Sequence, residues 1–138
     1  MIVPPRRYRL LWIGCVAVVV AAAVAITSAL AWSSQERSEK VARAITGGDP
    51  AHAPELFRRY GCTGCHTISG ISGADGQVGP PLSGLVHRVY IGGVATNTPD
   101  HLVQWIVSPQ SLSAQTAMPS SGISEAEARD VAAYLYSH

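Results

Sequence analysis

Charged residues are missing from one long stretch of this chain. Between Leu10 and Trp32, 23 consecutive residues include no Asp, Glu, Lys, Arg or His. At roughly 1.5 Å per residue, a helix of this length reaches about 35 Å, which is enough to cross a hydrocarbon core of about 30 Å. We therefore predict a short tail over residues 1–9, a transmembrane anchor helix over 10–32, and a region outside the membrane beyond it.

Acidic residues are also missing before this stretch, and their absence indicates its orientation. Arg6, Arg7 and Arg9 precede it with no Asp or Glu among them, a pattern typical of a cytoplasmic flank. Everything after Trp32 is then expected outside the cytoplasm. A cleaved signal peptide is the alternative, but its apolar region usually spans about 7–15 residues. A retained anchor is the favoured interpretation, with Cys15 as a small apolar residue within it.

The remaining residues show no alternation of apolar and polar positions, no repeats and no basic patch. These absences argue against sheet folds, repeat folds and nucleic-acid binding. Residues 33–53 form a polar linker that can continue the membrane helix as far as the break at Gly47-Gly48. Residues 54–138 are predicted to form an all-α domain, with helices at both ends and long loops between them.

Three helices of this domain have recognisable signals. Pro54 can occupy the first turn of a helix over 54–60. Thr98-Pro99 is a helix start, and that helix should end before Pro109. Ser124-x-x-Glu127 is a capping box that opens a last helix. Between them, residues 61–84 contain seven glycines and two prolines, so a central loop is expected that needs something to fill the middle of the domain.

Cysteine is scarce, and two of the three cysteines stand in one motif, Cys62-Thr63-Gly64-Cys65-His66. C-x-x-C-H is typical of c-type haem attachment, in which two thioethers tether the porphyrin and the imidazole of His66 binds the iron. A zinc site would need a second ligand cluster, and a redox C-x-x-C would follow a strand. A Cys62–Cys65 disulfide would leave His66 unexplained.

Methionine is scarcer still: apart from Met1, the only one is Met118. It lies in a loop downstream of the haem motif and is the predicted distal ligand, since His/Met ligation is usual in cytochromes c. Among the histidines, His87 is the main rival for this position. A lone methionine can also simply fill a core.

Three further residues have a possible role around a haem. Gly79-Pro80-Pro81-Leu82 is either a rigid turn or a rigid backbone with a carbonyl that accepts the Nδ1–H of His66 and fixes its tautomer. Arg88 and Trp105 are either ordinary core or surface residues, or donors to the haem propionates.

With these residues in place, the region from about Pro54 to His138 resembles a class I cytochrome c domain. It most resembles the C-terminal haem domain fused to subunit II of some bacterial haem–copper oxidases. The segments that support this resemblance are Leu56-Phe57, Gly61 to His66, Gly79 to Leu82 with Arg88, Asn97-Thr98-Pro99, Trp105 to Gln110, Met118-Pro119 and Ala133-Tyr134-Leu135.

The resemblance implies one covalently attached haem c on the periplasmic side of a bacterial cell membrane. It implies Pro80 over His66, Arg88 and Trp105 near the propionates, and Met118 as distal ligand. It also implies that Phe57 and Tyr134 pack where the first and last helices of the domain cross.

The function implied is electron transfer, not catalysis. The chain would pass single electrons in a respiratory chain, as a subunit delivering them to a terminal haem–copper oxidase. Its donor would be a soluble cytochrome c, a copper protein or a quinol-oxidising complex. A full oxidase subunit II has a copper-binding domain and two membrane helices, which these residues do not provide. The cytochrome subunit of a nitric oxide reductase or a free-standing membrane carrier therefore fits the layout equally. A haem peroxidase or gas-binding protein, and an assembly or sensor subunit, are further alternatives.

Overall fold

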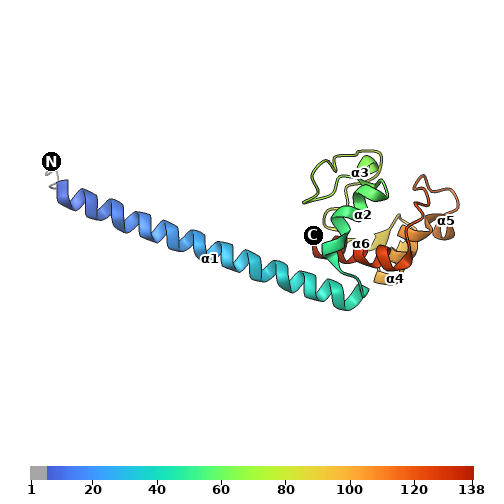
Figure 1. The fold of residues 1–138 in the computed structure, drawn as a ribbon, viewed down its shortest axis with the longest axis horizontal. Helices are drawn as coiled ribbons and strands as arrows, with labels where there is room; N and C mark the ends of the chain where they lie inside the picture. Colours follow the sequence, from blue (N-terminus) through green and yellow to red (C-terminus); the bar gives the residue numbers. More distant parts are fainter. Residues whose placement is uncertain (1–5) are drawn as a thin grey trace. The chain divides into compact units, whose positions relative to one another are not determined.

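The computed structural model describes residues 6–138, and the chain divides into two compact units, Met1–Glu36 and Arg37–His138. Helix α1, Arg6–Thr46, is continuous from the first unit into the second (Figure 1). It is the one helix in the described part of the chain that is long and apolar enough to cross a membrane. From Trp12 to Trp32 its apolar side chains are exposed, with Trp12 at 73% and Leu30 at 63%. The apolar stretch is thus helical, and the helix continues through the polar segment to Thr46.

The last turn of α1 belongs to the second unit and packs within it. Ala42 and Thr46 are each 1% exposed. Arg129 donates to the Thr46 carbonyl oxygen at 3.0 Å, and the backbone N–H of Asp49 donates to Asp130 at 2.6 Å. This unit therefore begins before residue 54, where the haem domain was predicted to start.

The second unit is mostly helical, as predicted. After α1 come the 3-10 helix η1 Pro50–His52, α2 Ala53–Arg59, α3 Cys62–Cys65, η2 Leu85–His87, α4 Pro99–Val107, α5 Pro109–Leu112 and α6 Glu125–Ser137. A two-residue antiparallel hairpin, β1 Tyr90–Ile91 with β2 Ala95–Thr96, lies between η2 and α4. Neither this hairpin nor α5 was predicted, because both are too short for a periodic pattern.

The predicted helix starts are confirmed. The Thr98 side chain accepts a hydrogen bond from the His101 backbone N–H and caps α4. Ser124 and Glu127 form the reciprocal capping box of α6. Two of the orphan N–H groups at the start of α6 are thereby satisfied.

The core of this unit lies where α2, α4 and α6 meet. Phe57 of α2 is fully buried and meets Tyr134 of α6 edge to face, with ring centroids 5.3 Å apart. This is the packing that the resemblance implied. The buried aliphatic side chains around it include Leu56, Leu102, Val103, Ile106, Val131 and Leu135.

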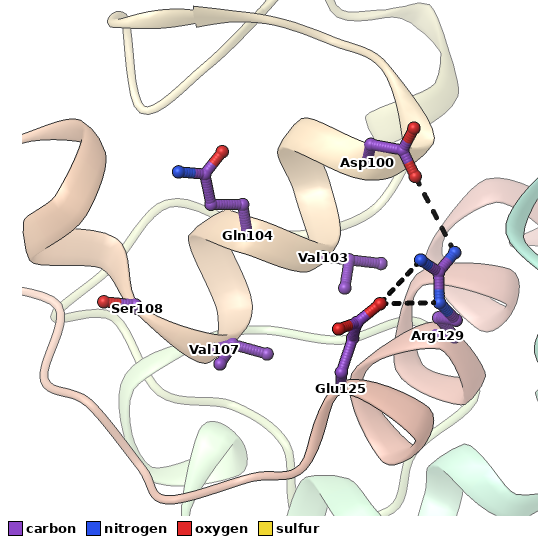
Figure 2. Close-up of a pocket in the computed structure, with 7 residues that line it drawn as sticks. All are labelled: Asp100, Val103, Gln104, Val107, Ser108, Glu125 and Arg129. Atoms are coloured by element: carbon purple, nitrogen blue, oxygen red, sulfur yellow. Dashed lines mark hydrogen bonds and ion pairs between the residues drawn. The ribbon is translucent and has the colours of Figure 1, made fainter.

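A cavity of about 360 Å³ lies between α4 and the start of α6 (Figure 2). Arg129 lies at its edge and forms ion pairs with Glu125 at 2.7 Å and Asp100 at 3.7 Å. Val103 and Val107 also line it. The lining includes neither the cysteine motif nor Met118, so this cavity is separate from the candidate site.

Candidate functional site

The cysteine motif forms a single helical turn directly after α2. Gly61 has a φ of 72°, a left-handed conformation that glycine adopts without strain, and it turns the chain into α3. Cys62 and Cys65 stand three residues apart on that turn, a spacing that places two side chains on one face of a helix. His66 leaves α3 in an extended conformation, and its N–H bonds to the Cys62 carbonyl oxygen at 2.9 Å. Both thiols and the imidazole therefore belong to one short, backbone-fixed segment.

A second segment, residues 76–82, is hydrogen-bonded to the end of this motif. The Gly79 N–H donates to the Cys65 carbonyl oxygen at 2.8 Å, and the Leu82 N–H donates to that of Thr67 at 2.9 Å. The Thr67 hydroxyl donates to the Gly76 carbonyl oxygen at 3.1 Å. These three bonds hold residues 76–82, an irregular segment that we call the strap, beside His66.

The strap fixes the imidazole. The Pro80 carbonyl oxygen lies 2.7 Å from Nδ1 of His66. A carbonyl oxygen can only accept, so Nδ1 carries a proton, and in the neutral imidazole Nε2 then keeps its lone pair for a metal. The sequence predicted that a carbonyl of Gly79–Leu82 accepts this hydrogen bond, and the structure gives Pro80 as the acceptor. Such a bond orients a histidine ligand.

Glycine is required at two positions of the strap. A Cβ atom on Gly79 would lie 2.3 Å from Cε1 of His66, and one on Gly76 would lie 2.6 Å from the backbone of Cys65. Neither distance leaves room for any side chain. The two glycines let the strap approach the motif closely enough for the Pro80 contact.

The alternatives to haem attachment, a disulfide and a metal site built from side chains alone, fit the structure less well. Both cysteines are free thiols, so they form no disulfide. Within residues 6–138, no three His, Cys, Asp or Glu side chains gather as a metal site built from them would require. Burial raises the pKa of the Cys62 thiol, which favours its protonated form before any bond to sulfur is made. Two free, half-buried thiols beside an oriented imidazole fit the attachment of a haem.

Met118 lies in the irregular segment between α5 and α6 and is partly buried. Its backbone is held on both sides by side chains: its N–H bonds to the Thr116 hydroxyl at 3.2 Å, and its carbonyl oxygen accepts from Gln110 at 2.8 Å. Its role as distal ligand stays a prediction.

The other histidines differ in how they are held. Nδ1 of His52, His101 and His138 each contacts a protein oxygen. His87 is exposed in η2 and remains the rival to Met118 as distal ligand. The variants described below separate the two.

Arg88 directly follows η2, and Trp105 lies in α4. The Arg88 guanidinium donates to the carbonyl oxygen of Pro81, with Ser83 as a second, longer contact at 3.5 Å. It therefore braces the end of the strap. The Trp105 ring packs against Gly92, where a Cβ would lie 2.6 Å from the ring. Contact of either side chain with a propionate stays a prediction.

Two residues with a central place in this arrangement were not assigned a role from sequence. Asn97 donates to the Leu85 and Arg88 carbonyl oxygens at 2.7 and 2.8 Å and accepts from the Tyr136 hydroxyl at 2.7 Å. Gln110 bonds to the Met118 segment. Both lie in the Asn-Thr-Pro to Pro-Gln stretch that supported the resemblance, which was the one signal available for them.

Polar contacts also join α2 to α6 beneath the motif. The Glu127 carboxylate accepts from the Ser124 hydroxyl at 2.6 Å and from the Tyr60 hydroxyl at 2.9 Å. The hydrogen bonds from Ser124 and Tyr60 lower the pKa of Glu127, and the bond to Glu127 raises the pKa of Tyr60. Tyr60, which directly precedes Gly61 and the motif, is thereby bonded to α6 through Glu127.

Comparison with known proteins adds one match. Residues 50–138 match a family model described as cytochrome c, which covers all elements from η1 to α6. Neither the curated proteins nor the solved structures that were searched include a match to this chain.

Proposed function

This chain belongs to the cytochrome c family, and from that premise we propose that it is a membrane-anchored electron carrier that delivers single electrons to a terminal haem–copper oxidase. The family carries haem c bound through a C-x-x-C-H motif, and Cys62 and Cys65 are in place for its two thioether bonds. When bound, the haem supplies an iron that exchanges one electron between its ferrous and ferric states.

The observation that best supports the site assignment is the hydrogen bond between His66 and Pro80. It leaves Nε2 as the free donor atom, which is the atom that His66 would present to the iron. The bond also increases the basicity of the imidazole. The strap bonds at Cys65 and Thr67 hold this arrangement, and a site that does not rearrange between redox states suits rapid electron exchange.

Met118 is proposed as the ligand on the other side of the iron. A second strong ligand leaves no open position for substrate, which favours electron transfer over peroxidase or gas-binding chemistry. A thioether ligand raises the reduction potential. The Met118 segment is suited to this role because its backbone is held on both sides of the methionine by Thr116 and Gln110.

Replacing Met118 tests this proposal. Met118→Ala should lower the reduction potential, abolish the sulfur-to-iron charge-transfer band and allow carbon monoxide to bind the ferrous protein. His87→Ala is the matched control, and it should change none of these. The opposite pattern, with His87→Ala opening the iron and Met118→Ala leaving it unchanged, would contradict the assignment.

Membrane attachment is proposed from α1. It has one charge-free stretch over Leu10–Trp32, and the apolar side chains from Trp12 to Trp32 are exposed. Anchoring would keep the haem near a membrane partner and raise its effective concentration. The three arginines that precede the stretch favour a cytoplasmic N-terminus and a haem domain on the outer side.

Purification of the full chain in a mild detergent tests the partner. We expect a haem–copper oxidase to copurify, with the cytochrome oxidised within the complex on addition of oxygen. Copurification of a nitric oxide reductase would instead support the alternative that this chain is the cytochrome subunit of that enzyme. An isolated chain that exchanges electrons only with soluble proteins would contradict the subunit role.

A further inference from the structure

We propose that Gln110 is a positioning residue that holds the Met118 segment closed and so protects the distal iron position from small exogenous ligands. The proposal rests on Met118 being the distal ligand. It concerns the equilibrium between bound and released methionine, which the proposed function leaves open.

Both ends of the Gln110 side-chain amide are used on this segment. Nε2 donates to the Met118 carbonyl oxygen at 2.8 Å, and Oε1 accepts from the Ser120 hydroxyl at 2.7 Å. The two contacts lie on either side of Pro119, whose ring fixes φ and limits the freedom of the chain between them. One side chain therefore bridges the backbone immediately after the methionine.

Gln110 is itself fixed. It lies in α5, which begins at the buried Pro109, and the Ser113 N–H closes this turn on the Pro109 carbonyl oxygen at 3.0 Å. The Ser111 hydroxyl donates to the Ser108 carbonyl oxygen at 2.7 Å and accepts from Gln104 of α4 at 3.2 Å. The amide of Gln110 thus projects from a platform that is joined to a longer helix.

The segment that Gln110 contacts has little other restraint. No backbone–backbone hydrogen bond involves residues 117–122 in the described part of the chain. The segment is held by side chains, at Thr116 before Met118 and at Gln110 after it, and by the buried Ile123 where it ends. Loss of the Gln110 contacts therefore removes most of the polar restraint on the C-terminal side of the methionine.

The effect of this restraint can be measured as ligand affinity. An exogenous ligand binds only the fraction of molecules in which methionine has left the iron, so its apparent dissociation constant rises as that fraction falls. Removing the two Gln110 bonds should raise the open fraction by about tenfold, the factor equivalent to about 1.4 kcal/mol. The apparent imidazole dissociation constant of the ferric protein should fall by about the same factor.

The experiment is an imidazole titration of the full-length ferric protein in detergent, followed by its absorbance. Gln110→Ala should bind about tenfold more tightly than the parent protein, while its sulfur-to-iron band before titration is retained. Ser120→Ala removes one of the two bonds and should give a smaller change, of about threefold. Gln110→Glu places a carboxylate against the Met118 carbonyl oxygen and should not restore the parent affinity.

Two controls separate this effect from others. Gln115→Ala removes an exposed glutamine of the same loop and should stay within about twofold of the parent protein. In a Met118→Ala background the position is already open, so adding Gln110→Ala should leave the imidazole affinity unchanged. A tenfold effect that persists in that background would show that Gln110 acts on the pocket and would overturn the proposal.

Failure of this inference is distinct from failure of the proposed function. Suppose that Met118→Ala binds imidazole far more tightly than the parent protein, but Gln110→Ala and Ser120→Ala bind it as the parent does. The proposed role of Gln110 is then wrong, and Met118 remains the distal ligand. If Met118→Ala itself leaves the imidazole affinity and the spectrum unchanged, Met118 is not the distal ligand, and the proposed role of Gln110 is wrong as well.

Discussion

The contact between α2 and α6 gives a quantitative test of the fold that supports the site. Phe57 is fully buried and meets Tyr134 edge to face. Truncating a buried phenylalanine to alanine costs about 3–5 kcal/mol, of which an aromatic pair accounts for about 0.5–1.5. Domains of this size are stable by about 5–15 kcal/mol. Phe57→Ala should therefore remove a large part of the stability, whereas Phe57→Leu should lose about 1–2 kcal/mol, from the aromatic pair and the imperfect fit.

Thermal unfolding of the full chain in detergent, followed by haem absorbance, measures this loss as a change in melting temperature. At about 4–8 °C per kcal/mol, the melting temperature of Phe57→Ala should fall by at least about 12 °C. Arg58→Ala is the matched control, because this side chain of the same helix is exposed and donates to the Pro54 carbonyl oxygen near the start of that helix. It should change stability by less than about 0.5 kcal/mol. A loss for Phe57→Ala as small as that of Arg58→Ala would refute the packing described.

Two further predictions concern the strap and the helix cap. Gly79→Ala should cost about 1–3 kcal/mol and lower the yield of haem-loaded protein, since its methyl group would lie 2.3 Å from the His66 ring. Gly64→Ala, whose methyl group meets no atom within 4 Å, should give normal stability and loading in the same unfolding and absorbance assays. The lowered pKa of Glu127 predicts that its contribution to stability is complete above the ordinary value of 4.5 and is lost as the pH falls through the lower folded-state pKa. Glu127→Gln should flatten the acid limb of the unfolding midpoint plotted against pH, and an unchanged limb would contradict the capping network.

The helical framework was predictable where local chemistry specifies it. A charge-free stretch, a Thr-Pro start and a capping box identified α1, α4 and α6, because caps and periodic burial are properties of neighbouring residues. Helix α5 was missed because Pro109 was interpreted only as the end of α4, although proline at a first helical position also starts a turn. The β1–β2 hairpin was missed because two-residue strands show no alternation, even though Gly92-Gly93 is a recognised turn signal.

The site was predictable for the groups that its chemistry requires and much less so for their supports. The cysteines and His66 were predicted from one motif, and a carbonyl acceptor for His66 was predicted from the rigid turn at Gly79–Leu82, without saying which carbonyl. The bonds of Asn97 and Gln110 were not, because they depend on the path of irregular segments, which no sequence period describes. The bond from Arg88 to the Pro81 carbonyl oxygen was likewise not predicted, and its contact with a propionate stays a prediction.

The central claim is that two thioethers tether one porphyrin to this polypeptide and that its iron lies between His66 and Met118. Intact-mass spectrometry of the denatured protein, produced in cells that attach haem, tests the tether most directly. We expect a mass increased by that of one haem for the parent chain, and no increase for a variant with both Cys62 and Cys65 replaced by serine. The unmodified polypeptide mass for the parent chain would contradict it.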